Sequence, residues 1–222
     1  MTFPAVLFSA GLDSAVLLAD AAARPGGAQP VYVSAGLAWE QAELDMAERF
    51  VAAMPPDAGV QPLVRLDVDM RDVYPATHWA VRGEAPGFDT PDEDVYIEGR
   101  NVVLLAKVAV FAARARLSRL LIGPLAGNPF PDATPAFFDA MARALSIGLG
   151  AELSIEAPFL QLRKEAVIRL GSSLGVRFEL TLSCMQPVDG AHCGRCSKCR
   201  ERRDAFRAAG LEDPAPRAAS AG

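Results

Sequence analysis

The sequence predicts an α/β fold, with a doubly wound, parallel, five-stranded sheet and a small C-terminal segment that contains all the cysteines. Three observations favour this fold. Short β-rich stretches alternate with longer helical patterns, which is typical of parallel strands joined by crossover helices. The first of these stretches runs directly into a turn of small residues, and the four cysteines lie close together between Cys184 and Cys199.

We expect strands and helices to alternate along most of the chain. The strands are expected at residues 5–8, 31–34, 63–68, 120–122 and 153–155. The helices are expected at residues 14–23, 41–54, 100–116, 135–148 and 163–174. The second helix has a clear helical period, with apolar residues at Leu44, Ala47, Phe50, Val51 and Met54. In such sheets, ligands bind beyond the carboxyl ends of the strands.

The chain divides into three parts. Residues 1–180 form the predicted α/β domain, and within it the segment 71–98 interrupts the alternation with prolines, glycines and a run of acids. Long irregular segments of this kind are lids or disordered insertions, and both interpretations stay open. Residues 181–210 contain the cysteines and a helix, and residues 211–222, rich in Ala, Pro, Ser and Gly, are expected to form a flexible tail.

Composition excludes several classes of protein. The chain is 51% hydrophobic and 22% charged, without a candidate membrane span or secretory signal, so we expect a cytoplasmic protein. A net charge of -5 argues against nonspecific nucleic-acid binding. The basic residues near the C-terminus form either a solvated helix face or a binding surface, and they are Arg195, Lys198, Arg200, Arg202 and Arg203.

The turn after the first strand is a candidate phosphate site. Ser9, Ala10 and Gly11 are small, so a phosphate can approach the backbone N–H groups closely. The unpaired N–H groups at the start of the following helix face the same anion. The hydroxyls of Ser9 and Ser14 add donors, and Asp13 is placed to cap the helix or to bind magnesium. The alternative is an ordinary strand-to-helix turn with Asp13 as its N-cap.

The cysteines follow the pattern C-x8-C-x2-C-x2-C, with thiols at Cys184, Cys193, Cys196 and Cys199. Four thiolates at this spacing complete a tetrahedral zinc shell with no open position, which indicates a structural site. An iron–sulfur cluster and free or redox-active thiols are the alternatives. His192 is expected beside the metal ligands or in solvent, and His78 is expected to be incidental.

The segment from Ser9 to Ser14 resembles the Ser-Gly-Gly-x-Asp-Ser pyrophosphate loop (PP-loop) of the N-type ATP pyrophosphatases, which have an adenine nucleotide alpha hydrolase-like fold. Within that superfamily the chain is similar to the 7-cyano-7-deazaguanine synthase (QueC) family over nearly its whole length. The further matches are Gly99-Arg100-Asn101, Glu156-Ala157-Pro158, residues 164–171, Leu174-Gly175-Val176, Ser183-Cys184 and residues 192–199.

The resemblance implies an ATP-dependent carbon–nitrogen ligase of queuosine biosynthesis. Such an enzyme converts 7-carboxy-7-deazaguanine and ammonia into 7-cyano-7-deazaguanine through an adenylylated intermediate, with magnesium on the phosphates and a structural zinc. The nucleotide contacts implied are Phe8, Ser9, Ala10, Gly11, Leu12, Asp13, Ser14, Arg100 and Asn101. The catalytic residues implied are Asp13, Ser14, Arg100 and Lys164. For Arg100 and Lys164 the alternative is a helix cap or a surface ion pair.

Three departures from the family pattern fall on or near the substrate positions. Ala10 replaces a glycine of the loop, and we expect its methyl group to be tolerated only at a negative φ, so that phosphate binding depends on this one dihedral angle. Residues 35–40 replace the family's Asp-Tyr-Gly-Gln segment, and residues 128–134 keep only the Pro-Asp core of another family segment. Within these segments, Trp39 and Asp132 are the candidate substrate contacts.

Several alternatives stay open at this point. A paralogue would adenylylate a different carboxylate and stop at an amide. A PP-loop enzyme that modifies tRNA would need a basic face or a further cysteine, and neither is evident. A non-catalytic binding module would retain only the fold. The alanine-rich helix near residues 102–115 leaves room for a homodimer interface, and the expected partners are a small-molecule carboxylate and ammonia, without nucleic acid or membrane.

Overall fold

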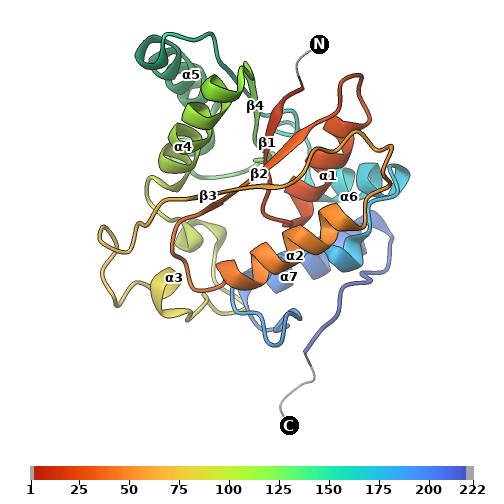
Figure 1. The fold of residues 1–222 in the computed structure, drawn as a ribbon. Coiled ribbons are helices and arrows are strands. Elements are labelled where there is room, and N and C mark those ends of the chain that lie inside the picture. Colours follow the sequence, from red (N-terminus) through yellow and green to blue (C-terminus); the bar gives the residue numbers. More distant parts are fainter. Residues whose placement is uncertain (1–2, 219–222) are drawn as a thin grey trace.

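The chain folds around a five-stranded sheet with the strand order β3-β2-β1-β4-β5 (Figure 1). The computed structural model describes residues 3–218. All strand pairs within the sheet are parallel. The strands are β1 (Ala5–Leu7), β2 (Gln29–Ser34), β3 (Val64–Asp67), β4 (Arg119–Leu121) and β5 (Ser154–Glu156). The predicted doubly wound α/β fold is therefore confirmed.

The central strand, β1, is the point where the direction of the winding reverses. It pairs with β2 on one side and with β4 on the other. The chain first moves outward through β2 to β3, and then crosses back to β4 and continues to β5. In doubly wound sheets the crevice at such a reversal is the usual ligand site. The small-residue turn lies there because it follows β1 directly.

Helices cover both faces of the sheet (Figure 1). Buried residues of α1 (Leu12–Ala22), α2 (Glu40–Ala52), α6 (Lys164–Ser173) and α7 (Ser197–Ala209) share one hydrophobic cluster. Residues of α4 (Arg100–Ala115) and α5 (Pro135–Leu149) form a second cluster with the opposite faces of the strands. The five predicted helices and five predicted strands begin and end within two residues of the observed ones.

The close packing of α6 on α1 depends on Gly171. A Cβ atom at this position would lie 2.6 Å from side-chain atoms of both Val16 and Phe178, so any other residue would force these side chains to shift. Glycine therefore allows the two helices to approach, at some loss of helix propensity. The approach brings the first residue of α6, Lys164, to the start of α1.

The segment 71–98 contains two short elements, α3 (Trp79–Arg82) and a 3₁₀ helix (Asp92–Val95). Two more 3₁₀ helices occupy Pro131–Ala133 and Phe178–Leu180. Tyr74, Ala80 and Ile97 of the segment are buried in a third hydrophobic cluster, together with Trp39. The segment thus packs against the loop between β2 and α2. Its function as a lid remains a prediction.

Residues 211–218 pack back onto residues 181–210, which contain the four cysteines and which we call the cysteine segment. The amide of His192 donates to the carbonyl of Pro216 at 3.0 Å, and the amide of Ala218 donates to the carbonyl of His192 at 2.9 Å. Asp213 is almost fully buried and pairs with Arg202. One buried acid and these backbone hydrogen bonds therefore join an otherwise Ala- and Pro-rich stretch to the rest of the chain, and the expected flexibility of the tail from residue 211 stays a prediction. Residues 219–222 lie outside the described residues.

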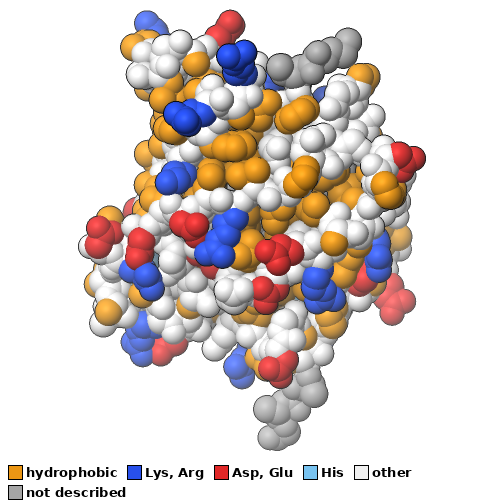
Figure 2. Space-filling view, viewed as in Figure 1, with side chains coloured by type: hydrophobic (Ala, Val, Ile, Leu, Met, Phe, Trp, Pro, Cys, Tyr) orange, Lys and Arg blue, Asp and Glu red, His pale blue; other side chains and the backbone are white. Residues whose placement is uncertain are grey.

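The surface has an apolar region between α4 and the edge strand β3 (Figure 2). Val64, Leu66 and Val68 of this edge are only partly buried, and Val102 and Val110 of α4 are exposed. This region is where the expected homodimer interface falls, and the dimer remains a prediction. None of the helices in residues 3–218 is long and apolar enough to span a membrane.

Candidate active site

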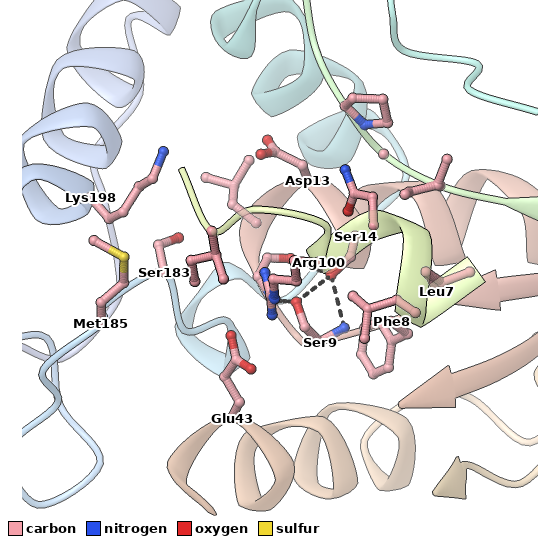
Figure 3. A pocket seen from close by; sticks show the side chains of 18 of the residues that line it. Leu7, Phe8, Ser9, Asp13, Ser14, Glu43, Arg100, Ser183, Met185 and Lys198 are labelled. Atoms are coloured by element: carbon pink, nitrogen blue, oxygen red, sulfur yellow. Dashed lines mark hydrogen bonds between the residues drawn. The ribbon is translucent and has the colours of Figure 1, made fainter. Parts of the chain in front are cut away.

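A pocket of about 340 Å³ lies beyond the carboxyl ends of β1 and β2 (Figure 3). We call it the switch-point pocket. Its walls come from the turn after β1, the first turns of α1 and α4, the 71–98 segment and the cysteine segment. The residues implied by the family resemblance come together here, since the lining includes Phe8, Ser9, Gly11, Leu12, Asp13, Ser14, Trp39, Arg100, Asn101, Asp132 and Lys164. Ala10 is fully buried beneath the turn.

The turn is held by its own serines, with both hydroxyls on the pocket side (Figure 3). The Ser14 hydroxyl donates to the carbonyl of Gly11 at 3.0 Å, and the amide of Ser9 donates to the Ser14 hydroxyl at 3.3 Å. Among residues 3–218, no side chain caps α1, whose N-cap residue is Gly11. The first N–H groups of this helix are therefore available to an anion in the pocket.

Ala10 adopts a left-handed conformation, with φ of 54°. The negative φ on which the sequence analysis made phosphate binding depend is therefore not observed, and phosphate binding by this turn stays a prediction. A left-handed alanine costs on the order of 1 kcal/mol. The surrounding structure stabilises this strained conformation, because Ala10 is fully buried and its carbonyl accepts a hydrogen bond from the amide of Leu182 at 2.8 Å. The turn thus keeps a conformation that glycine adopts without strain.

Four charged side chains form a chain of contacts along one wall of the switch-point pocket. The Nζ atom of Lys164 lies 3.1 Å from the Oδ2 atom of Asp13 and also pairs with Glu201. The Nζ atom of Lys198 lies 2.7 Å from Oε2 of the same Glu201. Burial raises the pKa of Asp13, although the charge of Lys164 opposes this. Burial also opposes ionisation of Glu201, but the two lysines lower its pKa to about 2.

Two polar atoms at this site are buried without a hydrogen-bond partner among the described residues, Oδ1 of Asp13 and Nε of Arg100. Buried polar groups are normally paired, so such atoms indicate a missing ligand. A carboxylate oxygen suits magnesium, and a guanidinium N–H suits a phosphate or carboxylate. The residues present therefore fit a magnesium nucleotide.

Asp132 is buried and binds the start of α4. Its Oδ2 atom accepts a hydrogen bond from the Asn101 amide at 3.1 Å, and its Oδ1 atom accepts one from the Asn101 side chain at 3.3 Å. These contacts make Asp132 a side-chain partner of the N-terminus of α4. Both residues also line the pocket, so the predicted substrate role of Asp132 remains a prediction.

Trp39 lies in the pocket wall, stacked on Trp79 with ring centroids 5.6 Å apart. Next to it is Glu43, which the sequence interpretation missed. The hydroxyl of Tyr32 lies 3.4 Å from a carboxylate oxygen of Glu43, and Arg100 and Glu43 both extend into the pocket (Figure 3). Burial raises the pKa of Glu43 to about 7.

A signal for Glu43 was present in the sequence. Glu43 precedes Ala47 by four residues and Phe50 by seven, so it lies on the apolar face of the predicted helix 41–54. An acid on the buried face of a helix is a candidate functional residue, because burial of an unpaired carboxylate is unfavourable.

The four cysteines come together in space as predicted. Their Sγ atoms all lie within 4.8 Å of one another, with separations of 3.9 Å for Cys184 and Cys196 and 3.5 Å for Cys196 and Cys199. None of the four forms a disulfide. Tetrahedral zinc with bonds of about 2.3 Å requires sulfur separations of about 3.8 Å. The amides of Gln186 and Cys193 donate to Cys184, as thiolate ligands require. The cluster therefore fits a zinc ion.

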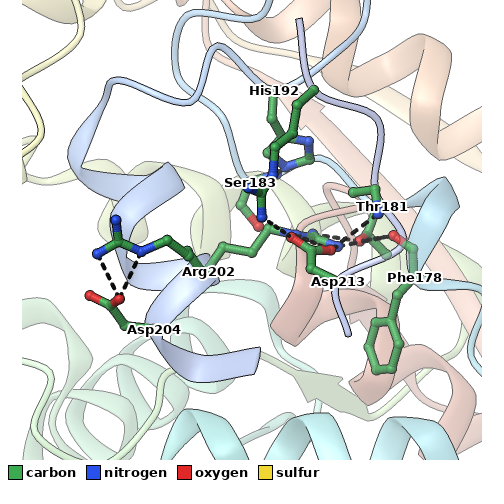
Figure 4. A network of polar contacts seen from close by, with 10 residues as sticks. Phe178, Thr181, Ser183, His192, Arg202, Asp204 and Asp213 are labelled. Carbon is green, nitrogen blue, oxygen red and sulfur yellow. Dashed lines mark hydrogen bonds and ion pairs between the residues drawn. The ribbon is translucent and has the colours of Figure 1, made fainter. Parts of the chain in front are cut away.

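Arg202, whose polar contacts Figure 4 shows, is not part of a solvated helix face, because only 2% of its side chain is exposed. Its guanidinium donates to both carboxylate oxygens of Asp213, to the Thr181 hydroxyl at 2.7 Å and to the Phe178 carbonyl at 3.1 Å. His192 lies in the same region and accepts a hydrogen bond from the Ser183 amide at 3.1 Å. These contacts join α7 to the chain on both sides of the cysteines.

Two solved structures share the fold. NMN synthetase from Francisella tularensis aligns with a TM-score of 0.51, covering 95% of this chain and 79% of that one, at 13% sequence identity. A predicted subunit of tRNA methyltransferase from Methanocaldococcus jannaschii aligns with a TM-score of 0.50, covering 78% of this chain and 75% of that one, also at 13% identity. At such identities the likeness concerns the fold alone.

Sequence comparison is more specific. The family model described as Queuosine biosynthesis protein QueC matches residues 4–210. The 7-cyano-7-deazaguanine synthase of Anaeromyxobacter dehalogenans (strain 2CP-C) is 34% identical over 220 residues, which cover 94% of this chain and 93% of that protein. The 7-cyano-7-deazaguanine synthase of Methanoculleus marisnigri is 42% identical over 123 residues, 54% of this chain and 55% of that protein. The chain therefore belongs to the QueC family of queuosine biosynthesis proteins.

Proposed function

We propose that this protein converts 7-carboxy-7-deazaguanine and ammonia into 7-cyano-7-deazaguanine, using ATP through an adenylylated intermediate. The observation that carries the proposal is the uncapped N-terminus of α1 beside the Asp13–Lys164 pair, both facing a pocket of about 340 Å³. Family membership supports the choice of reaction, since relatives of this length are named 7-cyano-7-deazaguanine synthases.

The first half of the proposed reaction makes an amide. A carboxylate oxygen of the substrate attacks the α-phosphorus of ATP, and the bond to pyrophosphate breaks. Pyrophosphate leaves toward the turn at Ser9–Ser14, where hydroxyl and backbone donors already face it. Ammonia then attacks the acyl carbon, AMP leaves with one former carboxylate oxygen, and the proton lost by nitrogen passes to solvent.

The second half makes the nitrile. The amide oxygen attacks the α-phosphorus of a second ATP, and pyrophosphate leaves again. Loss of AMP and of both N–H protons, which pass to solvent, then forms the carbon–nitrogen triple bond. We infer that Arg100 neutralises the adenylate phosphate, which its Nε atom supports because this atom has no hydrogen-bond partner within the described part of the chain. Lys164 partly offsets the burial that raises the pKa of Asp13, and so favours the carboxylate form that a cation needs.

Magnesium, when bound, would neutralise the phosphates, and Asp13 is the residue proposed to hold it directly or through water. Zinc, when bound by Cys184, Cys193, Cys196 and Cys199, would have a structural role, because four thiolates leave no open position. We propose that ammonia is used as such, and that the reaction takes place in the cytoplasm, where the thiols stay reduced.

Incubation of the purified protein with ATP, magnesium, ammonia and 7-carboxy-7-deazaguanine tests the proposal. Mass spectrometry should detect 7-cyano-7-deazaguanine, with AMP and pyrophosphate as the nucleotide products. A reaction that consumes ATP but yields no nitrile would contradict it.

A second candidate function is favoured by the loop between β2 and α2. Here the carboxylate of Glu40 accepts hydrogen bonds from the amides of Ala35 and Gly36, at 2.8 and 2.9 Å, and from the Ser34 hydroxyl at 2.7 Å. The loop that diverges from the family pattern is thus closed on itself and offers few polar groups to a purine-like base. A paralogue that adenylylates another carboxylate and stops at the amide is the alternative, and the product's mass separates the two.

A further inference from the structure

We propose that the cysteine segment supplies a cation to the active site, with Lys198 as a pyrophosphate-binding residue and Glu201 as the residue that positions both Lys198 and Lys164. The proposal rests on the proposed function only in taking pyrophosphate as the anion. It gives the cysteine segment a role in ligand binding besides its role in folding.

Lys198 differs from the other basic residues of the cysteine segment. It lines the switch-point pocket, where Figure 3 labels it, whereas the described lining contains none of Arg195, Arg200, Arg202 and Arg203. Arg202 is buried against Asp213, and Arg203 pairs with Asp204 and lies over the ring of Phe88. The side chain of Lys198 is 27% exposed, which leaves its ammonium group accessible to a ligand.

Glu201 forms ion pairs with both lysines from outside the pocket. Its carboxylate contacts Lys164 through one oxygen and Lys198 through the other. Both lysines line the pocket, but Glu201 does not. One acid from α7 therefore fixes two ammonium groups, one from α6 and one from its own helix, on the same wall of the pocket. Such a network loses less side-chain entropy on ligand binding than two free lysines would.

The position of Lys198 follows from the cysteines. Lys198 lies in the first turn of α7, between Cys196, the N-cap residue, and Cys199. Both neighbours belong to the thiol cluster, so a metal ion that joins them fixes the backbone of Lys198 as well. Because Glu201 is three residues further along, it lies on the same helix face as Lys198.

Charge balance explains why the lysines remain available to an anion. Asp13 and Glu201 together neutralise Lys164 and Lys198, so the free site carries no net charge from these four groups. Pyrophosphate, or the β- and γ-phosphates of ATP, adds several negative charges. Two prepositioned ammonium groups then meet that charge without reorganisation, together with the donors of the turn.

Binding of inorganic pyrophosphate with magnesium, measured by calorimetry on the zinc-loaded protein, tests the proposal. Lys198→Met should weaken binding at least about tenfold, a loss on the order of 1.4 kcal/mol. It should also reduce the dependence of binding on salt. Arg195→Met is the matched control from the same segment and should bind as the unmodified protein does. Unchanged binding by Lys198→Met, with an unchanged melting temperature, would overturn the proposal.

Glu201→Gln separates positioning from simple electrostatics by the sign of its effect. Loss of a negative charge beside the pocket should strengthen anion binding if Glu201 acts only through its field. If Glu201 positions the lysines, binding should weaken, and the double variant with Lys198→Met should lose little more than Lys198→Met alone. Tighter binding by Glu201→Gln would contradict the positioning role.

The outcomes also separate this proposal from the proposed function. Lys198-dependent pyrophosphate binding without nitrile formation would leave the inference intact and refute the reaction. Nitrile formation with full pyrophosphate affinity in Lys198→Met would support the reaction and refute the inference. Absence of pyrophosphate binding by the unmodified protein would refute the inference, whereas the reaction would still be judged by nitrile formation.

Discussion

The ammonium group of Lys164 lies 3.1 Å from the carboxylate of Asp13, which joins the first residue of α6 to the first turn of α1. These residues are far apart in the sequence, and they meet because Gly171 lets the two helices pack closely. Asp13 follows the phosphate turn, whereas Lys164 connects through Glu201 to the cysteine segment. The pair therefore links the N-terminal and C-terminal parts of the site.

Replacement of Asp13 tests the magnesium role. Asp13→Asn keeps the shape of the side chain but removes the charge that faces Lys164 and the unpaired Oδ1 acceptor. We expect pyrophosphate release to fall at least about tenfold, on the order of 1.4 kcal/mol in the barrier. Asp20→Asn, near the other end of the same helix, is the control and should keep the rate. Unchanged kinetics of Asp13→Asn would remove this residue from the site.

Replacement of Ala10 tests the conformation of the turn. In Ala10→Gly, relief of a left-handed φ is offset by the lost methyl burial and by backbone entropy, so the free energy of unfolding should change by less than about 1 kcal/mol. Ala10→Val should destabilise by at least about 2 kcal/mol, since a β-branched side chain is strained at positive φ and overpacks the core. Denaturant unfolding measures both, and an equal effect of the two changes would contradict the assigned conformation.

Replacement of one cysteine tests the metal site. We expect one zinc per chain, and Cys196→Ala should lose it, because the shell then has an open position. The variant should also unfold at lower temperature, since metal binding contributes folding free energy. Elemental analysis by mass spectrometry and thermal unfolding provide the two measurements, with the exposed Arg195→Ala as control. Full zinc retention in Cys196→Ala would refute the ligand assignment.

The raised pKa of the buried Glu43 carboxyl should make the stability of the protein depend on pH. Its pKa rises from 4.5 to about 7 on folding, mainly through burial, with Glu40 opposing its ionisation and Arg100, Trp39 and Tyr32 favouring it. The folded state thus binds the proton more tightly than the unfolded state. This contribution is complete below pH 4.5 and is lost as the pH rises through about 7.

Glu43→Gln should remove this dependence. Relative to the variant, the unmodified protein should lose on the order of 3 kcal/mol of stability between these pH values. Urea unfolding at a series of pH values is the measurement, and Glu48→Gln, exposed on the same helix, is the control. Parallel pH profiles for the unmodified protein and Glu43→Gln would show that the Glu43 carboxyl is not perturbed.

The elements of the sheet and its helices could be predicted because alternating strand and helix periods reflect local burial. The cysteine cluster could be predicted because its spacing is local as well. The Arg202–Asp213 pair could not, because it joins α7 to a segment that composition marks as a tail. The φ of Ala10 could not either, since the Leu182 amide that stabilises it comes from the far end of the chain. Polar contacts between residues far apart in the sequence determine both the packing of the C-terminal segment and the conformation of Ala10.

Transfer of ¹⁸O from the substrate to AMP tests the central claim, activation of a carboxylate by adenylylation. With 7-carboxy-7-deazaguanine labelled at both carboxylate oxygens, each nitrile formed should be accompanied by two AMP molecules, each carrying one ¹⁸O, and by unlabelled pyrophosphate. Unlabelled AMP, or ¹⁸O in pyrophosphate or in inorganic phosphate, would contradict the account.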